Sequence, residues 1–256
     1  MNRTRFAFAF LLAVFAALAF AQAQKTYEPS VGQEGKDVVW VPTPQAVVDK
    51  MLDMAKVTAR DFVIDLGSGD GRTVITAAKR GARALGIEYN PDMVELSKRN
   101  AEKESVVDRA SFVKADLFET DFSNATVITM FLLPEINLKL RPKILRLKPG
   151  TRIVSNTFTM GEWKADETAE LAAGGGCENS WCTALLWIVP ARVAGTHKLP
   201  QGELTLKQQF QMLSGSLRTE GKTFALRGRV NGEEIAFKAG GREYRGRFNG
   251  KELELR

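Results

Sequence analysis

Histidine and cysteine are scarce in this sequence of 256 residues, which holds one His and two Cys. A structural zinc site takes about four nitrogen or sulfur ligands. Cys177 and Cys182, with the distant His197, do not supply such a set, so we expect no metal site. His197 is expected to lie in a surface loop. No catalytic triad is visible either, so any chemistry must rest on other residues.

Long hydrophobic runs and a strong charge imbalance are also missing from most of the chain. The composition is 44% hydrophobic and 26% charged, and the formal net charge is +6. These values suit one globular domain of ordinary size with a small addition. So modest a positive charge permits an acidic surface or a nucleic acid as a partner but argues for neither.

One uncharged run, residues 6–21, does stand near the N-terminus. Two arginines precede it, and residues 21–23 (AQA) follow it as a small-x-small cleavage site. This pattern predicts a secretory signal peptide over residues 1–23 and hence export to the periplasm or the medium. An uncleaved membrane anchor is the alternative. Because oxidising compartments favour disulfides, a bond between Cys177 and Cys182 would fit export, and the sequence leaves this bond open.

A glycine-rich turn at residues 65–71 (DLGSGDG) is the feature around which the rest of the chain is organised. The apolar residues 61–64 before it predict a buried parallel strand, and residues 72–80 after it predict a helix. A second predicted strand, residues 82–88, ends in an acid. In a doubly wound α/β sheet this order holds a nucleoside, with amides at the helix start and the carboxylate on the ribose hydroxyls.

The glycine spacing indicates which nucleoside. A dinucleotide fingerprint needs G-x-G-x-x-G, and the place of its third glycine holds Arg72 here. The G-x-G-x-G pattern, with an acid two residues ahead, resembles motif I of class I S-adenosylmethionine (SAM) methyltransferases. This resemblance implies SAM as the cofactor; a glycine turn in an unrelated α/β protein is the alternative. The expected cofactor-binding residues are Asp65, Gly67, Ser68, Gly69, Asp70, Gly71, Glu88, Tyr89, Asp116 and Leu117.

Three acids at strand ends are each expected to bind a different part of this cofactor. Asp65 and the amides beside it would hold the charged methionine part. Glu88, which follows Gly71 by 17 residues, would bond the ribose. Asp116 follows the third predicted strand, where methyltransferases of this class commonly bond the adenine amino group. An Asx turn is the alternative role of Asp116.

The remaining pattern predicts an α/β fold with a Rossmann-like, seven-stranded methyltransferase sheet, followed by a small antiparallel β-meander. Thr43 and Pro44 are expected to cap and start a helix over residues 45–55. The apolar run 125–133 predicts a buried fourth strand. Alternating residues and two Asn-Gly turns near the C-terminus predict a meander of five or six strands. Further expectations are helices over 91–105 and 141–148, strands over 111–114 and within 147–155, and domains over 24–195 and 200–256. A strand over 183–189 is expected to run antiparallel and close the sheet.

The end of the fourth predicted strand is where the methyl acceptor is expected. The residues there are apolar (130–134, MFLLP), and no Asn-Pro-Pro-Tyr or Asp-Pro-Pro-Tyr is present. Those motifs bond planar nitrogens, so their absence argues against methylation of adenine N6 or glutamine. An apolar mouth suits an aliphatic amine instead. Thr43, Phe131 and Pro134, together with Trp40, are expected to form the wall of the substrate channel.

Four stretches together support a family. They are residues 41–44 (VPTP), 65–72 (DLGSGDGR), 86–91 (GIEYNP) and 112–117 (FVKADL). They resemble the lysine methyltransferases that act on the ATP synthase c-subunit and the adenine nucleotide translocase, and their bacterial relatives. The resemblance covers residues 38–165 and leaves out the meander.

This resemblance implies a SAM-dependent enzyme that methylates a lysine ε-amine of a protein, with membrane proteins among the candidates. A methyltransferase for RNA or a small molecule is one alternative, although export disfavours a nucleic acid partner. A non-catalytic SAM-binding scaffold is another. The sequence leaves the oligomeric state open, and it leaves open how an exported enzyme would obtain a cofactor that is made in the cytoplasm.

Overall fold

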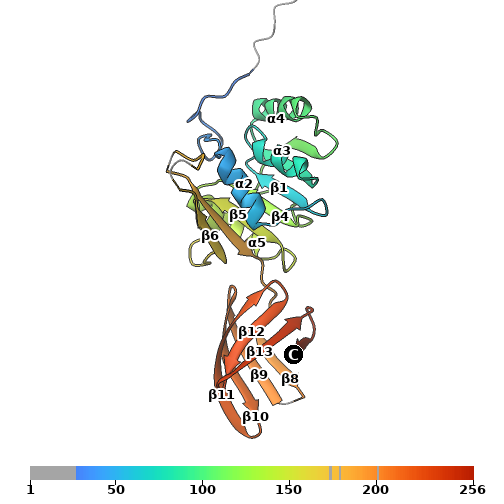
Figure 1. Ribbon diagram of the computed structural model, residues 1–256, viewed down its shortest axis with the longest axis vertical. Coiled ribbons are helices and arrows are strands. Elements are labelled where there is room, and N and C mark those ends of the chain that lie inside the picture. Colours follow the sequence, from blue (N-terminus) through green and yellow to red (C-terminus); the bar gives the residue numbers. More distant parts are fainter. Residues whose placement is uncertain (1–26, 173–174, 179, 201) are drawn as a thin grey trace, which may run out of the picture.

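Two seven-stranded sheets follow one another along the chain in a computed structural model, which describes residues 27–172, 175–178, 180–200 and 202–256 (Figure 1). The predicted signal peptide, residues 1–23, lies outside the described residues. No helix within the described part of the chain has the length and apolar character that crossing a membrane requires.

The first sheet is a doubly wound α/β sheet, as predicted. In spatial order its strands are β3 (Ala110–Lys114), β2 (Arg83–Glu88), β1 (Phe62–Leu66), β4 (Val127–Met130), β5 (Arg152–Asn156), β7 (Thr183–Ile188) and β6 (Glu167–Glu170). The strands from β3 to β5 are parallel, and β7 runs antiparallel to both β5 and β6. The strand order reverses between β1 and β4, which is where sheets of this kind bind ligands, beyond the carboxyl ends of the strands.

Alternate residues of the central strands face two separate hydrophobic layers. The helices are α2 (Gln45–Met54), α3 (Arg72–Lys79), α4 (Pro91–Lys103) and α5 (Pro134–Ile144). Val63 packs in a cluster with helices α2, α3 and α4, whereas the next residue, Ile64, packs in a second cluster with helix α5. The period of two along each strand thus gives the sheet a helical cover on both faces.

Several predicted boundaries differ from the observed ones. The helix expected to be capped by Thr43 begins one residue later, with Pro44 in the cap position and no side-chain cap bond. Strand β4 covers only four residues of the apolar run 125–133. The chain leaves the sheet after Met130 instead. Pro134 starts helix α5, where its fixed φ and missing N–H fit the first turn. Helix α5 was expected only from residue 141, and strand β6 was not predicted.

The second sheet is an antiparallel meander in which each strand pairs with its neighbours in the chain. Its seven strands, rather than five or six, are β8 (Gly195–Leu199), β9 (Gly202–Gln209), β10 (Met212–Thr219), β11 (Lys222–Asn231), β12 (Glu234–Ala239), β13 (Arg242–Phe248) and β14 (Leu253–Leu255). Both predicted Asn-Gly turns join strands of this sheet, with Gly232 at φ 59° and Gly250 at φ 94°. Strand β8 lies before residue 200 and carries no turn signal of its own.

Contacts between the two sheets lie at the amino ends of the parallel strands. The ring of Phe210 stacks on Trp163 at 6.1 Å between centroids, and the Gln211 side chain donates to the Lys164 carbonyl at 2.7 Å. Gly232 lies against Gly150, which precedes β5. The meander is therefore attached at the end of the first sheet that faces away from the carboxyl ends of its strands.

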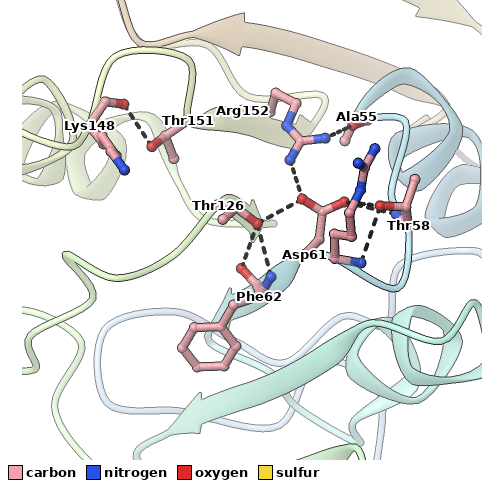
Figure 2. A network of polar contacts seen from close by, with 9 residues as sticks. Ala55, Thr58, Asp61, Phe62, Thr126, Lys148, Thr151 and Arg152 are labelled. Carbon is pink, nitrogen blue, oxygen red and sulfur yellow. Dashed lines mark hydrogen bonds and ion pairs between the residues drawn. The ribbon is translucent and has the colours of Figure 1, made fainter.

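A network around Asp61 ties the amino ends of β1, β4 and β5 together (Figure 2). The Asp61 carboxylate accepts from the backbone N–H and hydroxyl of Thr58, from the Thr126 hydroxyl and from Arg152. The Arg152 guanidinium also donates to the Ala55 carbonyl at 2.7 Å. Burial opposes ionisation of Asp61, but these hydrogen bonds outweigh it and lower the pKa of the carboxyl.

Candidate functional site

A cavity of ≈ 240 Å³ opens beyond the carboxyl ends of β1, β2 and β4. Its walls come from the glycine turn, from residues that follow β2, β3 and β4, and from the segment 33–43. The site therefore lies at the switch point of the doubly wound sheet, as the strand order predicts.

The glycine turn is held in a backbone conformation that favours glycine. Gly67, Gly69 and Gly71 have φ values of 76°, 53° and 83°. A Cβ on Gly69 would lie 2.6 Å from the Trp40 Nε1 atom, and one on Gly71 would lie 2.8 Å from the Phe112 ring. A side chain at either position would thus meet both a strained φ and a collision.

Side chains of helix α4 form hydrogen bonds with the backbone of this turn. The Ser97 hydroxyl donates to the Gly69 carbonyl at 2.8 Å, and the Asn100 amide donates to the Asp70 carbonyl at 2.9 Å. Asp70 is paired with Arg72, which also donates to the Thr43 carbonyl at 3.0 Å. The turn is consequently preorganised before any ligand arrives.

Glu88 stands at the end of β2, where the sequence placed the ribose-binding acid. Its carboxylate accepts from the backbone N–H groups of Gly69 and Asn90, both at 2.9 Å. Two fixed donors hold the side chain against the turn and leave further lone pairs for a ligand hydroxyl. Tyr89, the next residue, lines the same cavity and is half exposed.

Asp65 is the acid nearest the centre of the sheet, and it is 6% exposed. Its carboxyl accepts from the Thr129 hydroxyl of the neighbouring strand β4. Burial, together with the negative charges of Glu88 and Asp70, raises the pKa of Asp65 to about 7. Among the described residues no cation forms an ion pair with it. The cavity therefore presents a buried carboxyl that a positively charged ligand would stabilise in its ionised form.

Asp116 follows strand β3 and also lines the cavity. One carboxylate oxygen accepts from the Phe118 backbone N–H at 2.9 Å, which is the Asx turn considered above, and the other pairs with Lys36. The Lys36 hydrogen bond lowers the pKa of the Asp116 carboxyl. The Lys36 ammonium also lies 4.7 Å from the centroid of the Tyr89 ring. One oxygen of Asp116 thus forms the Asx turn while the other is available for a polar contact, so the two expected roles of this side chain do not exclude each other.

The predicted substrate wall is only partly as expected. Trp40, Thr43 and Phe131 line the cavity, and so do Gly67, Ser68, Gly69, Asp70 and Leu117, whereas Pro134 and Gly71 do not. Pro134 occupies the first turn of helix α5, and Gly71 caps helix α3.

The lining residues that were not predicted include Lys36, Phe158 and Trp181. Phe158 lies just past the carboxyl end of the parallel strand β5, and Trp181 lies just before β7, so the approach of Trp181 to the cavity depends on the antiparallel direction of β7. Cys177 and Cys182, left open by the sequence, form a disulfide.

The strand order, the glycine turn and the three acids at successive strand ends together define a class I SAM-dependent methyltransferase. Residues 65–167 match the family model described as the ANTKMT methyltransferase domain. A protein-lysine N-methyltransferase of Saccharolobus islandicus (strain REY15A) is 44% identical over 164 residues, covering 63% of this chain and 96% of that protein. The lysine N-methyltransferase of the ATP synthase c-subunit from Homo sapiens is 33% identical over 143 residues, covering 56% of this chain and 59% of that protein.

A solved structure matches as well. The RNA methyltransferase from Salinibacter ruber, in complex with S-adenosyl-L-homocysteine, is 46% identical, with a TM-score of 0.55 and coverage of 60% of this chain and 96% of that chain. This chain belongs to the family of the protein-lysine N-methyltransferases and their ANTKMT-type relatives. More than a third of the chain lies outside the region that matches the Saccharolobus islandicus protein. The family model, which matches residues 65–167, does not include the meander.

The residues of the cavity fit SAM. Glycines clear a path close to the backbone, and the uncompensated Asp65 carboxyl offers a negative charge to the positive methionine part. Glu88 and Asp116 stand at the ends of the next two strands, β2 and β3, where the ribose and adenine are expected. When bound, the cofactor supplies a methyl group on a positively charged sulfur that leaves as a neutral thioether. The residues of the chain need only bind and orient the cofactor and the methyl acceptor and exclude water from the site.

Proposed function

We propose that this enzyme transfers the methyl group of SAM to the ε-amine of a lysine side chain in a protein. The observation that carries the proposal is the family membership, with 44% identity over 96% of a protein-lysine N-methyltransferase. The acceptor side of the cavity supports it. Phe131, Phe158 and Trp181 make that side apolar and aromatic, which suits the end of an aliphatic side chain.

The chain can assist this transfer without a dedicated base. A lysine ammonium must give its proton to water before its nitrogen can attack carbon, and removal of the group from bulk solvent into an apolar surrounding favours the neutral amine. The nitrogen lone pair then forms the new N–C bond while the C–S bond breaks and its electrons remain on sulfur. Alignment of amine and methyl group supplies most of the rate acceleration in such a reaction.

We also propose that the enzyme works outside the cytoplasm, with a membrane protein among its candidate substrates. The predicted signal peptide supports export, and so does the Cys177–Cys182 disulfide, because such bonds persist mainly in oxidising compartments. The relatives named for the ATP synthase c-subunit support a membrane-protein substrate. Export is tested by cell fractionation with alkylation of free thiols. Recovery in the cytoplasm with both cysteines alkylated would count against it.

Radiolabelled methyl transfer to cell fractions tests the activity itself. The purified enzyme is incubated with methyl-labelled SAM and with membrane, soluble and RNA fractions of its host. We expect label that survives ribonuclease, is released by protease and appears as methyl-lysine after acid hydrolysis. A Gly69→Arg variant serves as the inactive control.

RNA is the second candidate acceptor, because the 46% identical solved structure is that of an RNA methyltransferase. Label that is removed by ribonuclease and resists protease would support RNA and contradict the lysine proposal. No label in any fraction, from an enzyme that binds SAM in a titration, would point to a non-catalytic scaffold.

A further inference from the structure

Three aromatic side chains meet at the acceptor side of the cavity, and each lies next to the end of a different strand. Phe131 follows β4, Phe158 follows β5, and Trp181 precedes β7. These strands are neighbours in the sheet, and β7 is antiparallel, with Ala184 opposite Asn156. The amino end of β7 therefore meets the carboxyl ends of β4 and β5. The topology brings three rings to one edge of the sheet.

The rings are arranged around Phe131. Phe158 stacks on it, with centroids 5.7 Å apart and planes at 17°, and Trp181 meets it edge-on, with centroids 6.0 Å apart and planes at 63°. All three residues are partly exposed and line the cavity. An aromatic ring attracts an alkylammonium that lies over its face through the ring quadrupole, and tryptophan does so most strongly.

The disulfide secures one of these rings. Cys177 is 3% exposed and belongs to the hydrophobic cluster that includes helices α2 and α3, and Cys182 packs against the same cluster. Trp181 is the residue next to Cys182. The bond between the two sulfurs thus ties the backbone beside Trp181 to a buried anchor. Gly176, next to Cys177, lies close to Ala46 at the start of helix α2.

We propose that Phe131, Phe158 and Trp181 form a subsite for the alkylammonium end of the acceptor, and that the Cys177–Cys182 disulfide holds Trp181 in it. The inference rests on the proposed lysine methylation and names the contacts that recognise the acceptor as it arrives in its protonated form. The ammonium then gives its proton to water before the neutral amine attacks the methyl group. Reduction by a dithiol converts the disulfide into two thiols while the reductant becomes a cyclic disulfide. The subsite then loses its fixed tryptophan, whereas the SAM-binding acids on β1, β2 and β3 stay in place.

A tetraalkylammonium ion separates cation recognition from mere apolar contact. The full oxidised chain, with the disulfide verified by thiol titration, is titrated with tetramethylammonium chloride and, separately, with the neutral isostere 2,2-dimethylpropanol. Binding is followed by saturation-transfer NMR of the ligand protons. We expect millimolar binding of the cation and at least fivefold weaker binding of the alcohol. Equal binding of the two probes would overturn the cationic subsite.

Variants then test the tryptophan and the disulfide. Trp181→Ala, the double variant Cys177→Ser with Cys182→Ser, and the wild-type chain in dithiothreitol should each weaken tetramethylammonium binding at least fivefold. Trp181→Phe should recover part of it. SAM affinity, measured by calorimetry on the same samples, should stay within twofold. Unchanged cation binding in Trp181→Ala would contradict the subsite, and unchanged binding after reduction would contradict the role of the disulfide.

The same titrations distinguish failure of this inference from failure of the proposed function. If the wild-type chain binds SAM but not the cation, the subsite is wrong and the methyltransferase stands. If the wild-type chain binds neither, the proposed function itself fails. A labelled-transfer assay adds a kinetic check, because Trp181→Ala should raise KM for the protein acceptor by at least fivefold while changing kcat by less.

Discussion

Two aspartates at the two ends of strand β1 have opposite electrostatic roles. Asp61 precedes the strand and Asp65 lies within it, and they are similarly buried, at 8% and 6% exposed. Hydrogen bonds from Thr58, Thr126 and Arg152 outweigh burial at Asp61 and lower its pKa. At Asp65 burial dominates, two carboxylates lie nearby, and the pKa rises to about 7.

The comparison teaches that exposure alone does not tell a structural acid from a ligand-binding one. Asp61 already has its cation, Arg152, so its charge stabilises the fold. Among the described residues the Thr129 hydroxyl is the one hydrogen-bond partner of the Asp65 carboxyl, so the charge of Asp65 costs folding free energy until a cationic ligand compensates it. Asp61 at one end of β1 thus acts on the stability of the fold, and Asp65 at the other end acts on ligand binding. A substitution at either residue can test its role separately.

Blocking the glycine turn should have the largest effect, and only on the binding end. Gly69→Arg places a side chain against Trp40 at a positive φ, so we expect SAM binding to be lost, by at least 100-fold, in a protein that still folds. Calorimetry and circular dichroism measure the two properties. Gly221→Arg is the matched control, because Gly221 has φ 72° and open space around it. Retained SAM affinity in folded Gly69→Arg would refute the placement of the turn.

Neutralising Asp65 should weaken binding and strengthen the fold. Between its ordinary pKa of 3.8 and about 7 the folded chain holds a proton at Asp65 that the unfolded chain has lost. Asp65 therefore lowers the free energy of unfolding as pH rises through this window. Asp65→Asn removes that loss, and we expect about 1–2 kcal/mol of stabilisation at pH 8 by urea unfolding. SAM affinity should fall about 50-fold, or about 2 kcal/mol. A destabilised Asp65→Asn chain would contradict this description.

The same substitution at the other end should act in the opposite direction. Asp61→Asn leaves Arg152 without its counter-charge and turns one acceptor oxygen into a donor, so we expect about 2 kcal/mol of destabilisation at pH 7. The pKa of Asp61 is lowered on folding, so its stabilising effect is present at neutral pH and is lost as pH falls through the folded pKa. SAM affinity should change less than twofold. Asp53→Ala, at an exposed ion pair with Arg80, is the control for a surface charge.

The smallest effect is expected at Lys36. Its ammonium pairs with one carboxylate oxygen of Asp116 and so competes with adenine for that carboxylate. Lys36→Ala should tighten SAM binding up to threefold and leave the melting temperature within one degree, because this pair is exposed. Calorimetry and thermal unfolding provide the check. Weaker SAM binding would instead show that Lys36 helps to close the cavity.

The sequence predicts the binding end of the sheet well because its features are local. The glycine turn, Glu88 and Asp116 each follow a strand whose apolar residues identify it, and parallel strands bring their ends to one edge. The doubly wound sheet and the antiparallel meander are confirmed for the same reason. The roles of Glu88 and Asp116 in ribose and adenine binding stay predictions.

Features that depend on pairing between distant residues were missed. Arg152 reaches Asp61 across 91 positions of the chain, and Lys36 reaches Asp116 across 80. Trp181 enters the site because β7 runs antiparallel, as expected, but no local pattern indicates that the loop before β7 reaches the cavity. The end of β4 and the start of helix α5 were misplaced because a continuous apolar run does not reveal where the chain leaves the sheet.

The most direct test of a ligand-directed Asp65 is the pH dependence of SAM binding. Calorimetric titrations of the wild-type chain and Asp65→Asn are made at pH 6 and pH 8, so that titration of SAM itself cancels between the two proteins. With a pKa of about 7, the ionised fraction of Asp65 rises about tenfold between the two pH values. We predict that wild-type affinity rises by about this factor relative to the affinity of Asp65→Asn. Equal pH dependence in both proteins, or no SAM binding by the wild-type chain, would contradict the claim.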